Sequence, residues 1–267
     1  MNEGILYYQD SKLHYEKSGT GSQVLLAFHG FGQNKSYFDE LIKIWSDNYT
    51  IYTFDIYFHG ESFWPNGKER PLTKADWQAI IKAFVIQEDI TRFSLVGFSM
   101  GGKFVLATLE NFADHVNEIT LIAPDGIKTS FWYSLATYPL FFRKIFENII
   151  HQPKPYYALL KTLRSLRLMD KSLLKFAKFQ MDTPRKRQQV YDTWVSFRLL
   201  SFDMAHIAQL INSKHIDLTM YLGKYDQIIS EKNMDRLLSK LHQYQLHILD
   251  CGHNNLLSAL AKHLKKA

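Results

Sequence analysis

Short runs of consecutive apolar residues recur along the chain, separated by stretches in which apolar residues return every three or four positions. The apolar runs occupy residues 24–28, 49–55, 92–96, 116–123, 216–222 and 245–249. Uninterrupted runs of this length are typical of strands buried on both faces of a parallel sheet. The stretches with helical spacing occupy residues 36–45, 73–90, 103–109, 230–241 and 255–264. Strands that alternate with helices predict an α/β fold, with a mostly parallel central sheet and helices on both faces.

Two parts of the chain depart from this alternation. Residues 5–18 alternate between apolar and polar positions, which predicts a two-stranded hairpin near the start. Residues 127–214 contain only segments of helical spacing, and Pro139 should bend the first of them. We therefore expect a core built from residues 1–126 and 215–267, with residues 127–214 inserted as a helical cap.

The stretch Gly97-Phe98-Ser99-Met100-Gly101 links a predicted strand to a predicted helix and reads Gly-x-Ser-x-Gly. A serine in this context sits on a sharp turn, where the strand and the helix approach so closely that neighbours without a Cβ are required. The turn lifts the hydroxyl clear of the sheet and places it at a helix N-terminus, which favours negative charge. The context predicts Ser99 as a nucleophile. The alternative is a tight turn that happens to carry a serine.

A nucleophilic serine needs a base to remove its proton and an acid to orient that base. Asp226 and His253 each follow one of the last two predicted strands. Because the carboxyl ends of parallel strands meet at one edge of a sheet, both side chains should lie near Ser99. Asp125, which follows the strand after the serine turn, is the alternative acid.

In combination, these features resemble the α/β-hydrolase fold of the single-domain, capped type. The motifs that carry the resemblance are His-Gly-x-Gly at 29–32, Asp55 with His59-Gly60-x-Ser62, the serine turn, Gly-x-x-Asp ending at 226 and Gly-His at 252–253. The resemblance implies a catalytic triad of Ser99, Asp226 and His253, and an oxyanion hole formed by the amides of Phe31 and Met100. The chain departs from the family at Tyr57-Phe58, where Pro-Gly is common.

The triad chemistry predicts a serine hydrolase that cleaves a small carboxylic ester or thioester through an acyl-enzyme. Two alternatives remain open. Capped relatives include carbon–carbon hydrolases and the menaquinone-pathway lyase, which act on anionic substrates, and a non-catalytic ligand receptor could use the same fold. We expect Phe98, Tyr57, Phe58 and Phe142 to contact the substrate, with the pair Tyr57-Phe58 walling the pocket entrance.

Several other side chains near these motifs have plainer interpretations. Cys251 is expected to be a small buried residue rather than a second nucleophile. His29 and His59 flank the predicted site and are expected to have structural, hydrogen-bonded roles. Lys103 is expected to be a solvated residue of the helix after the serine turn.

Charge is unevenly distributed along the chain. The net charge is +6, and residues 127–214 contain fifteen Lys or Arg against five Asp or Glu. A positive field from this segment would favour anionic substrates, whereas a solvated outer helix face is the plainer interpretation. Because no nucleic-acid-reading module accompanies the charge, we expect no nucleic-acid partner.

The remaining expectations concern partners and location. The chain shows no secretory signal and no apolar run that could span a bilayer, and its single cysteine, Cys251, excludes an intrachain disulfide. We therefore expect a cytoplasmic protein. The predicted chemistry requires no cofactor and no metal. The expected partner is a small-molecule substrate, and the sequence does not define an oligomeric state.

Overall fold

The computed structural model describes residues 2–266 except 66, 68, 130 and 167–170. It consists of two compact units. The first comprises Met1–Pro65, Thr73–Lys128 and Leu200–Ala267, and the second comprises Asn66–Leu72 and Thr129–Leu199.

One sheet forms the centre of the first unit. In the described residues it has eight strands, in the spatial order β1-β2-β4-β3-β5-β6-β7-β8. Their bounds are β1 Asn2–Tyr8, β2 Ser11–Ser18, β3 Gln23–Phe28, β4 Tyr49–Phe54, β5 Phe93–Phe98, β6 Val116–Ile122, β7 Asp217–Gly223 and β8 Gln245–Leu249. Strands β3 to β8 run parallel, and the β1–β2 hairpin joins antiparallel to β4. The predicted α/β class with a mostly parallel sheet is confirmed.

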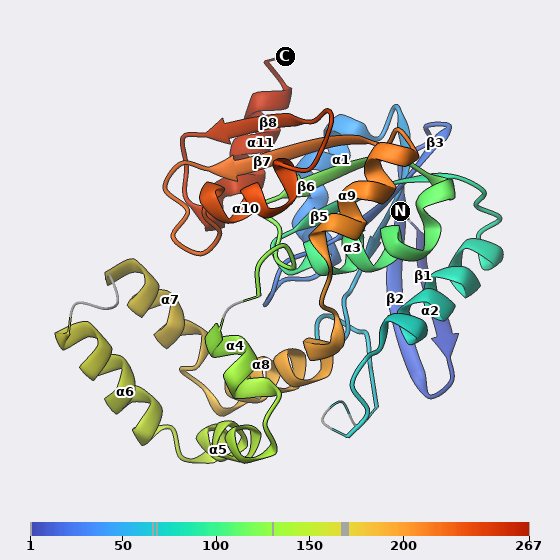
Figure 1. The fold of residues 1–267 in the computed structure, drawn as a ribbon. Helices are drawn as coiled ribbons and strands as arrows, with labels where there is room; N and C mark the ends of the chain where they lie inside the picture. Colours follow the sequence, from blue (N-terminus) through green and yellow to red (C-terminus); the bar gives the residue numbers. More distant parts are fainter. Residues whose placement is uncertain (1, 66, 68, 130, 167–170, 267) are drawn as a thin grey trace. The chain divides into compact units, whose positions relative to one another are not determined.

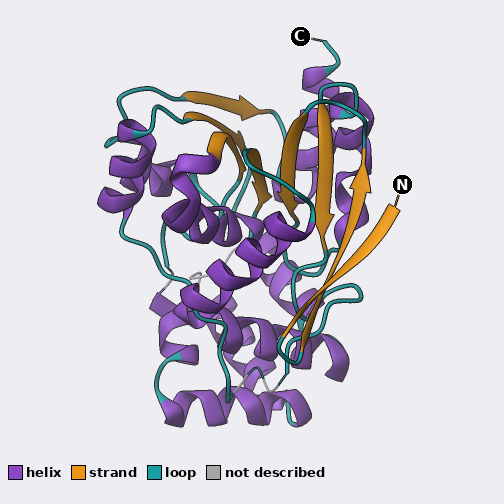
Figure 2. Ribbon diagram, turned by 90° about the vertical axis from the view of Figure 1, so that its right-hand side faces the viewer, coloured by secondary structure: helices purple, strands orange, loops and turns teal. Residues whose placement is uncertain are grey.

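Helices cover both faces of this sheet (Figures 1 and 2). The helices of the first unit are η1 Lys35–Phe38, α1 Asp39–Trp45, α2 Lys74–Gln87, α3 Gly101–Phe112, η2 Ala113–His115, α9 Met204–Ser213, α10 Glu231–Leu238, η4 His253–Asn255 and α11 Leu256–Leu264. Helix α1 packs against α11, while α3 packs between α2 and α9, and α9 contacts α10. In a doubly wound parallel sheet, the helices that connect successive strands pack on both faces.

Helix α2 illustrates how local sequence fixes these elements. Thr73 caps its first turn, and the carboxylate of Asp76 accepts a hydrogen bond from the Thr73 amide in return, which completes a capping box. The inner face of α2 buries Trp77, whose indole N–H donates to Thr108 on α3 at 3.0 Å. The neighbouring Phe104 ring lies edge-on to Trp77 at 4.8 Å. Aromatic pairs of this kind stabilise the helix–helix contact beyond the apolar area that they bury.

In the second unit, all regular elements among the described residues are helices. Its helices are α4 Phe131–Thr137, α5 Leu140–His151, α6 Lys154–Ser165, α7 Lys171–Gln180, α8 Pro184–Ser196 and η3 Phe197–Leu199. Pro139 separates α4 from α5, in agreement with its predicted effect. Buried Arg187 on α8 donates to the carbonyls of Ile150 and Met181, which ties three helix ends together.

The bounds of the second unit differ from the expected insertion at 127–214. Residues 200–214 belong to the first unit, because α9 packs on α3 and α10 there. Helical spacing alone did not reveal this, since α9 has the same amphipathic pattern as the helices before it. In neither unit do the described residues include a helix long and apolar enough to cross a membrane.

Candidate active site

The serine turn has the strained geometry that its sequence predicts. Ser99 adopts a φ of 51°, in the left-handed region that non-glycine residues rarely enter. A Cβ on Gly101 would lie 1.9 Å from the Phe28 carbonyl oxygen, and one on Gly97 would lie 2.7 Å from the Gly101 carbonyl. Both glycines are therefore needed for the close approach of β5, α3 and β3. Non-glycine residues hold such a conformation only where their surroundings impose it, commonly at functional sites.

The structure brings Ser99, His253 and Asp226 together. Ser99 Oγ lies 2.9 Å from His253 Nε2, and His253 Nδ1 lies 2.6 Å from Asp226 Oδ2. A carboxylate can only accept, so Nδ1 carries the proton and Nε2 is left to accept the serine hydroxyl. The second carboxylate oxygen of Asp226 accepts from the amides of Ile228 and Ile229, at 2.8 and 2.9 Å. Both oxygens of this side chain, which is fully buried, therefore accept hydrogen bonds.

Aromatic packing holds His253 in place. The Phe98 ring stands 5.0 Å from the His253 imidazole, and Tyr37 stacks on Phe98 at 6.0 Å. The Tyr37 hydroxyl also donates to the carbonyl of Asn254 at 3.3 Å. Sequence reasoning missed Tyr37, although an aromatic residue soon after His-Gly-x-Gly was a possible signal. Phe98 itself is only 1% exposed and packs on the imidazole, and its predicted contact with a substrate stays a prediction.

Two backbone amides, one in the loop after β3 and one in the serine turn, are predicted to form an oxyanion hole. Phe28 on β3 pairs with Gly97 on β5, so the loop after β3 and the serine turn leave the sheet side by side. The amides of Phe31 and Met100 donate to no protein acceptor in the described part of the chain. In the sheet, β4 lies on one side of β3 and β5 lies on the other, so the strand order changes direction between β3 and β5. Ligand sites in open α/β sheets form at such a point.

A family model for the α/β-hydrolase fold matches residues 23–260. This range covers most of the chain and includes strands β3 to β8, the serine turn and His253. The chain belongs to the α/β-hydrolase family.

Two curated relatives match this chain over less than half of its length. A probable alcohol acetyltransferase from Wickerhamomyces anomalus is 30% identical over 100 residues, 37% of this chain and 28% of that protein. The chain matches less than a third of the length of the curated relatives, 30% and 28%.

Among solved structures, a thermophilic esterase from Thermogutta terrifontis shares 15% identity and a TM-score of 0.70, covering 100% of this chain and 97% of that one. A meta-cleavage product hydrolase from Pseudomonas fluorescens shares 17% identity and a TM-score of 0.66, with 98% and 95% covered. These structures share the α/β-hydrolase fold.

The pair Tyr57-Phe58 departs from the α/β-hydrolase pattern in an unexpected way. Tyr57 is fully buried, packs against Trp64 and lies within hydrogen-bond distance of Ser11 Oγ, at 3.2 Å. The expectation that Tyr57 walls a pocket entrance is therefore wrong: this ring is part of the core beneath the hairpin. Phe58 is half-buried and has a φ of 67°, in the region that favours the glycine common in the family.

Lys103 is also placed differently from the prediction, and its partner is Asp125, the alternative acid. Lys103 is 6% exposed rather than solvated, and its Nζ lies 3.2 Å from Asp125 Oδ2. The Asp125 amide donates to the Ser99 carbonyl at 2.8 Å, so this ion pair adjoins the serine turn. The structure pairs His253 with Asp226 and leaves Asp125 with Lys103.

Phe142 lies on α5 in the second unit and is 38% exposed. Its ring contacts Phe141, which is more exposed at 69%. Its predicted contact with a substrate stays a prediction.

Two buried histidines of the first unit predict an acid-sensitive fold. Burial lowers the pKa of His29 to about 3 and that of His59 to about 4. In the unfolded chain both would titrate near their ordinary value of about 6.5, so unfolding takes up protons below that pH. We expect the free energy of unfolding to fall as pH decreases from about 6.5 towards 4, by up to about 1.4 kcal/mol per pH unit for each histidine. Urea melts at a series of pH values measure this slope, and an equal slope in His59→Gln would contradict the assignment.

Proposed function

We propose that the protein is a serine hydrolase that cleaves a small carboxylic ester or thioester through an acyl-enzyme. The observation that supports this most strongly is the pair of short contacts from Ser99 through His253 to Asp226, at 2.9 and 2.6 Å. An isolated serine hydroxyl is a poor nucleophile, and this arrangement supplies both the base and its orienting acid. The esterase fold neighbour is consistent with the proposal.

In this mechanism Ser99 Oγ attacks the acyl carbon while His253 Nε2 takes the hydroxyl proton. The amides of Phe31 and Met100 donate to the oxygen that becomes negative in the tetrahedral intermediate. His253 then protonates the leaving alcohol or thiol, and the acyl group remains on Ser99. Water, activated by the same imidazole, releases the carboxylic acid and restores the serine. Asp226 keeps the proton on Nδ1 and stabilises the imidazolium.

A series of p-nitrophenyl esters of increasing acyl length, with a serine-reactive fluorophosphonate beside it, tests the proposal. Turnover together with labelling of Ser99 is the expected result. Labelling without ester turnover would instead favour a carbon–carbon hydrolase or a menaquinone-pathway-like lyase. Neither labelling nor turnover would favour a ligand receptor on the same fold.

An anionic substrate is a second candidate, and one feature of the second unit favours it. Arg143 Nε is buried and, among the described residues, has no hydrogen-bond partner. Burial and the nearby positive charge of Arg143 lower the pKa of Arg198. A buried donor without an acceptor costs free energy, and a bound oxyanion would remove that cost. Two neighbouring guanidinium groups would therefore favour an anionic ligand. A meta-cleavage product hydrolase among the fold neighbours fits this alternative.

Salt dependence tests a preference for anionic substrates without any substitution. If a positive field attracts the substrate, kcat/KM for a p-nitrophenyl ester with a free carboxylate should fall on the order of threefold or more from low to high ionic strength. The uncharged ester of the same acyl length should change little, and it serves as the matched control. Equal salt dependence for both esters would reject a preference for anions.

A further inference from the structure

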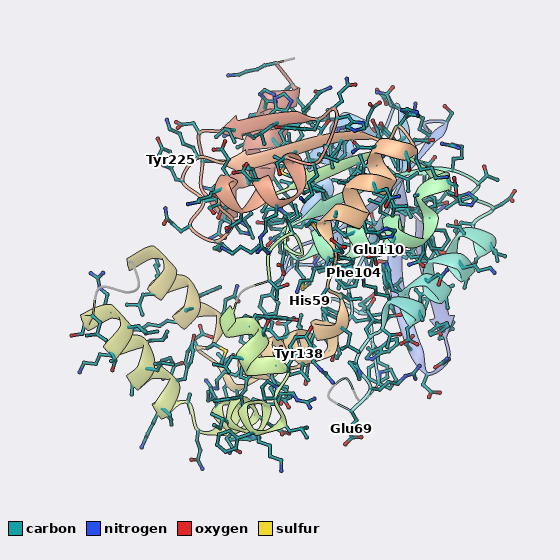
Figure 3. The ribbon with its side chains drawn as sticks, in the orientation of Figure 1. His59, Glu69, Phe104, Glu110, Tyr138 and Tyr225 are labelled. Carbon is teal, nitrogen blue, oxygen red and sulfur yellow. The ribbon has the colours of Figure 1, made fainter. Side chains whose placement is uncertain are left out.

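A buried lysine in the first turn of α3 lies close to the serine turn, and the proposed mechanism does not use it. Lys103 Nζ lies 3.2 Å from Asp125 Oδ2. Phe104, the next residue of α3 and one of those labelled in Figure 3, is fully buried, so this end of the helix does not face solvent. The helix dipole disfavours a positive charge at a helix N-terminus, and burial adds to the cost. The Asp125 carboxylate offsets that cost.

Asp125 is itself fixed in the loop that follows β6. Its Oδ1 accepts the Gly126 amide at 2.7 Å, while its Oδ2 faces Lys103. The loop packs closely on α3, since a Cβ on Gly102 would lie 2.6 Å from Pro124 Cβ. A Cβ on Gly126 would likewise lie 3.2 Å from Lys103 Cγ. The ion pair and these close contacts hold the loop against the first turn of α3.

The backbone of this loop reaches the proposed nucleophile. The Asp125 amide donates to the Ser99 carbonyl oxygen at 2.8 Å, and the Gly102 amide donates to the same oxygen at 2.9 Å. A carbonyl oxygen has two lone pairs near the plane of its peptide, so two donors fix that plane more firmly than one. One of the two donors belongs to α3 itself. The other belongs to the loop that the Lys103–Asp125 pair holds in place.

The direction of the Met100 amide follows from these contacts. A trans peptide is planar, and its N–H points opposite to its C=O. The Ser99 carbonyl and the Met100 N–H belong to one peptide unit, so this N–H points away from the loop after β6. Within the described part of the chain it has no protein acceptor, which leaves it available to a ligand. Its direction therefore depends on that loop as well as on the serine turn.

We propose that Lys103 and Asp125 are positioning residues, whose ion pair holds the loop after β6 so that the Asp125 amide fixes the Ser99–Met100 peptide with its N–H aimed at the oxyanion. The inference rests on the proposed serine hydrolase function and extends it to two residues outside the triad. Preorganised donors stabilise a transition state because they need not reorient as charge develops. A buried ion pair that served stability alone would have no effect on that stabilisation.

Matched substitutions at Lys103 separate the two roles. Lys103→Arg keeps a cation that can pair with Asp125, and Lys103→Met has a similar length without the charge. We expect kcat for a p-nitrophenyl ester to fall on the order of 10-fold in Lys103→Met, with KM nearly unchanged and a smaller loss in Lys103→Arg. Thermal unfolding and near-ultraviolet circular dichroism establish that both variants are folded.

A trifluoromethyl ketone provides a direct readout of the oxyanion. Ser99 Oγ bonds to its carbonyl carbon, the carbonyl electron pair moves to oxygen, and His253 accepts the hydroxyl proton. The adduct therefore carries a negative oxygen, as the tetrahedral intermediate of the ester does. The affinity for this ketone should fall in Lys103→Met by the same factor as kcat.

A second pair of variants decides the question if Lys103→Met does not fold. The Asp125 side chain is 35% exposed, so substitutions there disturb the core less. Asp125→Asn keeps an oxygen that can accept from the Gly126 amide and from Lys103, whereas Asp125→Ala keeps none. We expect Asp125→Ala to lose more kcat and more ketone affinity than Asp125→Asn.

The outcomes are distinct. Equal kcat in the charge-keeping and charge-lacking variants at Lys103, a loss confined to KM, or an unchanged ketone affinity would overturn the positioning role. A wild-type protein that neither cleaves esters nor binds the ketone would overturn the proposed function and this inference together.

Discussion

Replacing Ser99 by alanine should abolish ester hydrolysis, with a loss on the order of 10⁶ in kcat. The loss is this large because the three triad groups act as a unit, and the base has no function without its nucleophile. KM should change little, since the hydroxyl contributes mainly to the transition state. Steady-state kinetics on a p-nitrophenyl ester measure both values.

Cys251 provides the matched control for the Ser99 experiment. It lies two residues before His253, and burial together with the charges of Asp226 and Asp250 raises the pKa of its thiol. A thiol that is mostly protonated is a poor nucleophile, so Cys251→Ala should keep most of the activity. If instead Ser99→Ala remained active and Cys251→Ala did not, the assignment of the nucleophile would be wrong.

Replacing Asp226 by asparagine should lower kcat on the order of 10⁴. The asparagine amide can donate to the imidazole, which favours the tautomer with its proton on Nε2. That tautomer cannot accept the Ser99 proton. A structure of the variant should show the same side-chain positions. The fall in kcat would then measure the loss of the tautomer that can accept the Ser99 proton.

Asp125→Asn is the control for this second prediction. Asp125 pairs with Lys103 and accepts the Gly126 amide at 2.7 Å, and its carboxylate is not bonded to His253. Removing its charge leaves Lys103 buried beside a neutral partner, so stability should fall while kcat changes far less than in Asp226→Asn. A larger loss of kcat in Asp125→Asn would reverse the assignment of the acid.

The convergence of Ser99, Asp226 and His253 could be predicted from sequence for a simple reason. Each residue follows a strand, and parallel strands end at the same edge of the sheet, so the distance along the chain does not matter. The catalytic roles of these residues remain predictions, because proximity alone does not establish reactivity. The break at Pro139 was equally predictable, since proline in a helix interior removes a backbone hydrogen bond and clashes with the preceding turn, whereas it is tolerated at a helix start.

The misplaced residues depend on contacts that local sequence does not encode. Lys103 looked solvated, but α3 is covered by the sheet, α2 and α9, and it has no exposed face near its start. The nearly continuous apolar composition around Lys103 was the available signal of a helix buried on all sides. Tyr57 is buried against Ser11 and Trp64, and the Ser11 contact comes from a distant part of the chain.

Trapping the acyl-enzyme tests the central claim most directly. The protein is mixed with a p-nitrophenyl ester, quenched in acid within the burst of p-nitrophenol release, digested and analysed by mass spectrometry. The account predicts that the acyl mass appears on the peptide that contains Ser99, and that it is absent from Ser99→Ala. Turnover with the acyl group on another residue, or with no covalent intermediate under any quench time, would contradict it.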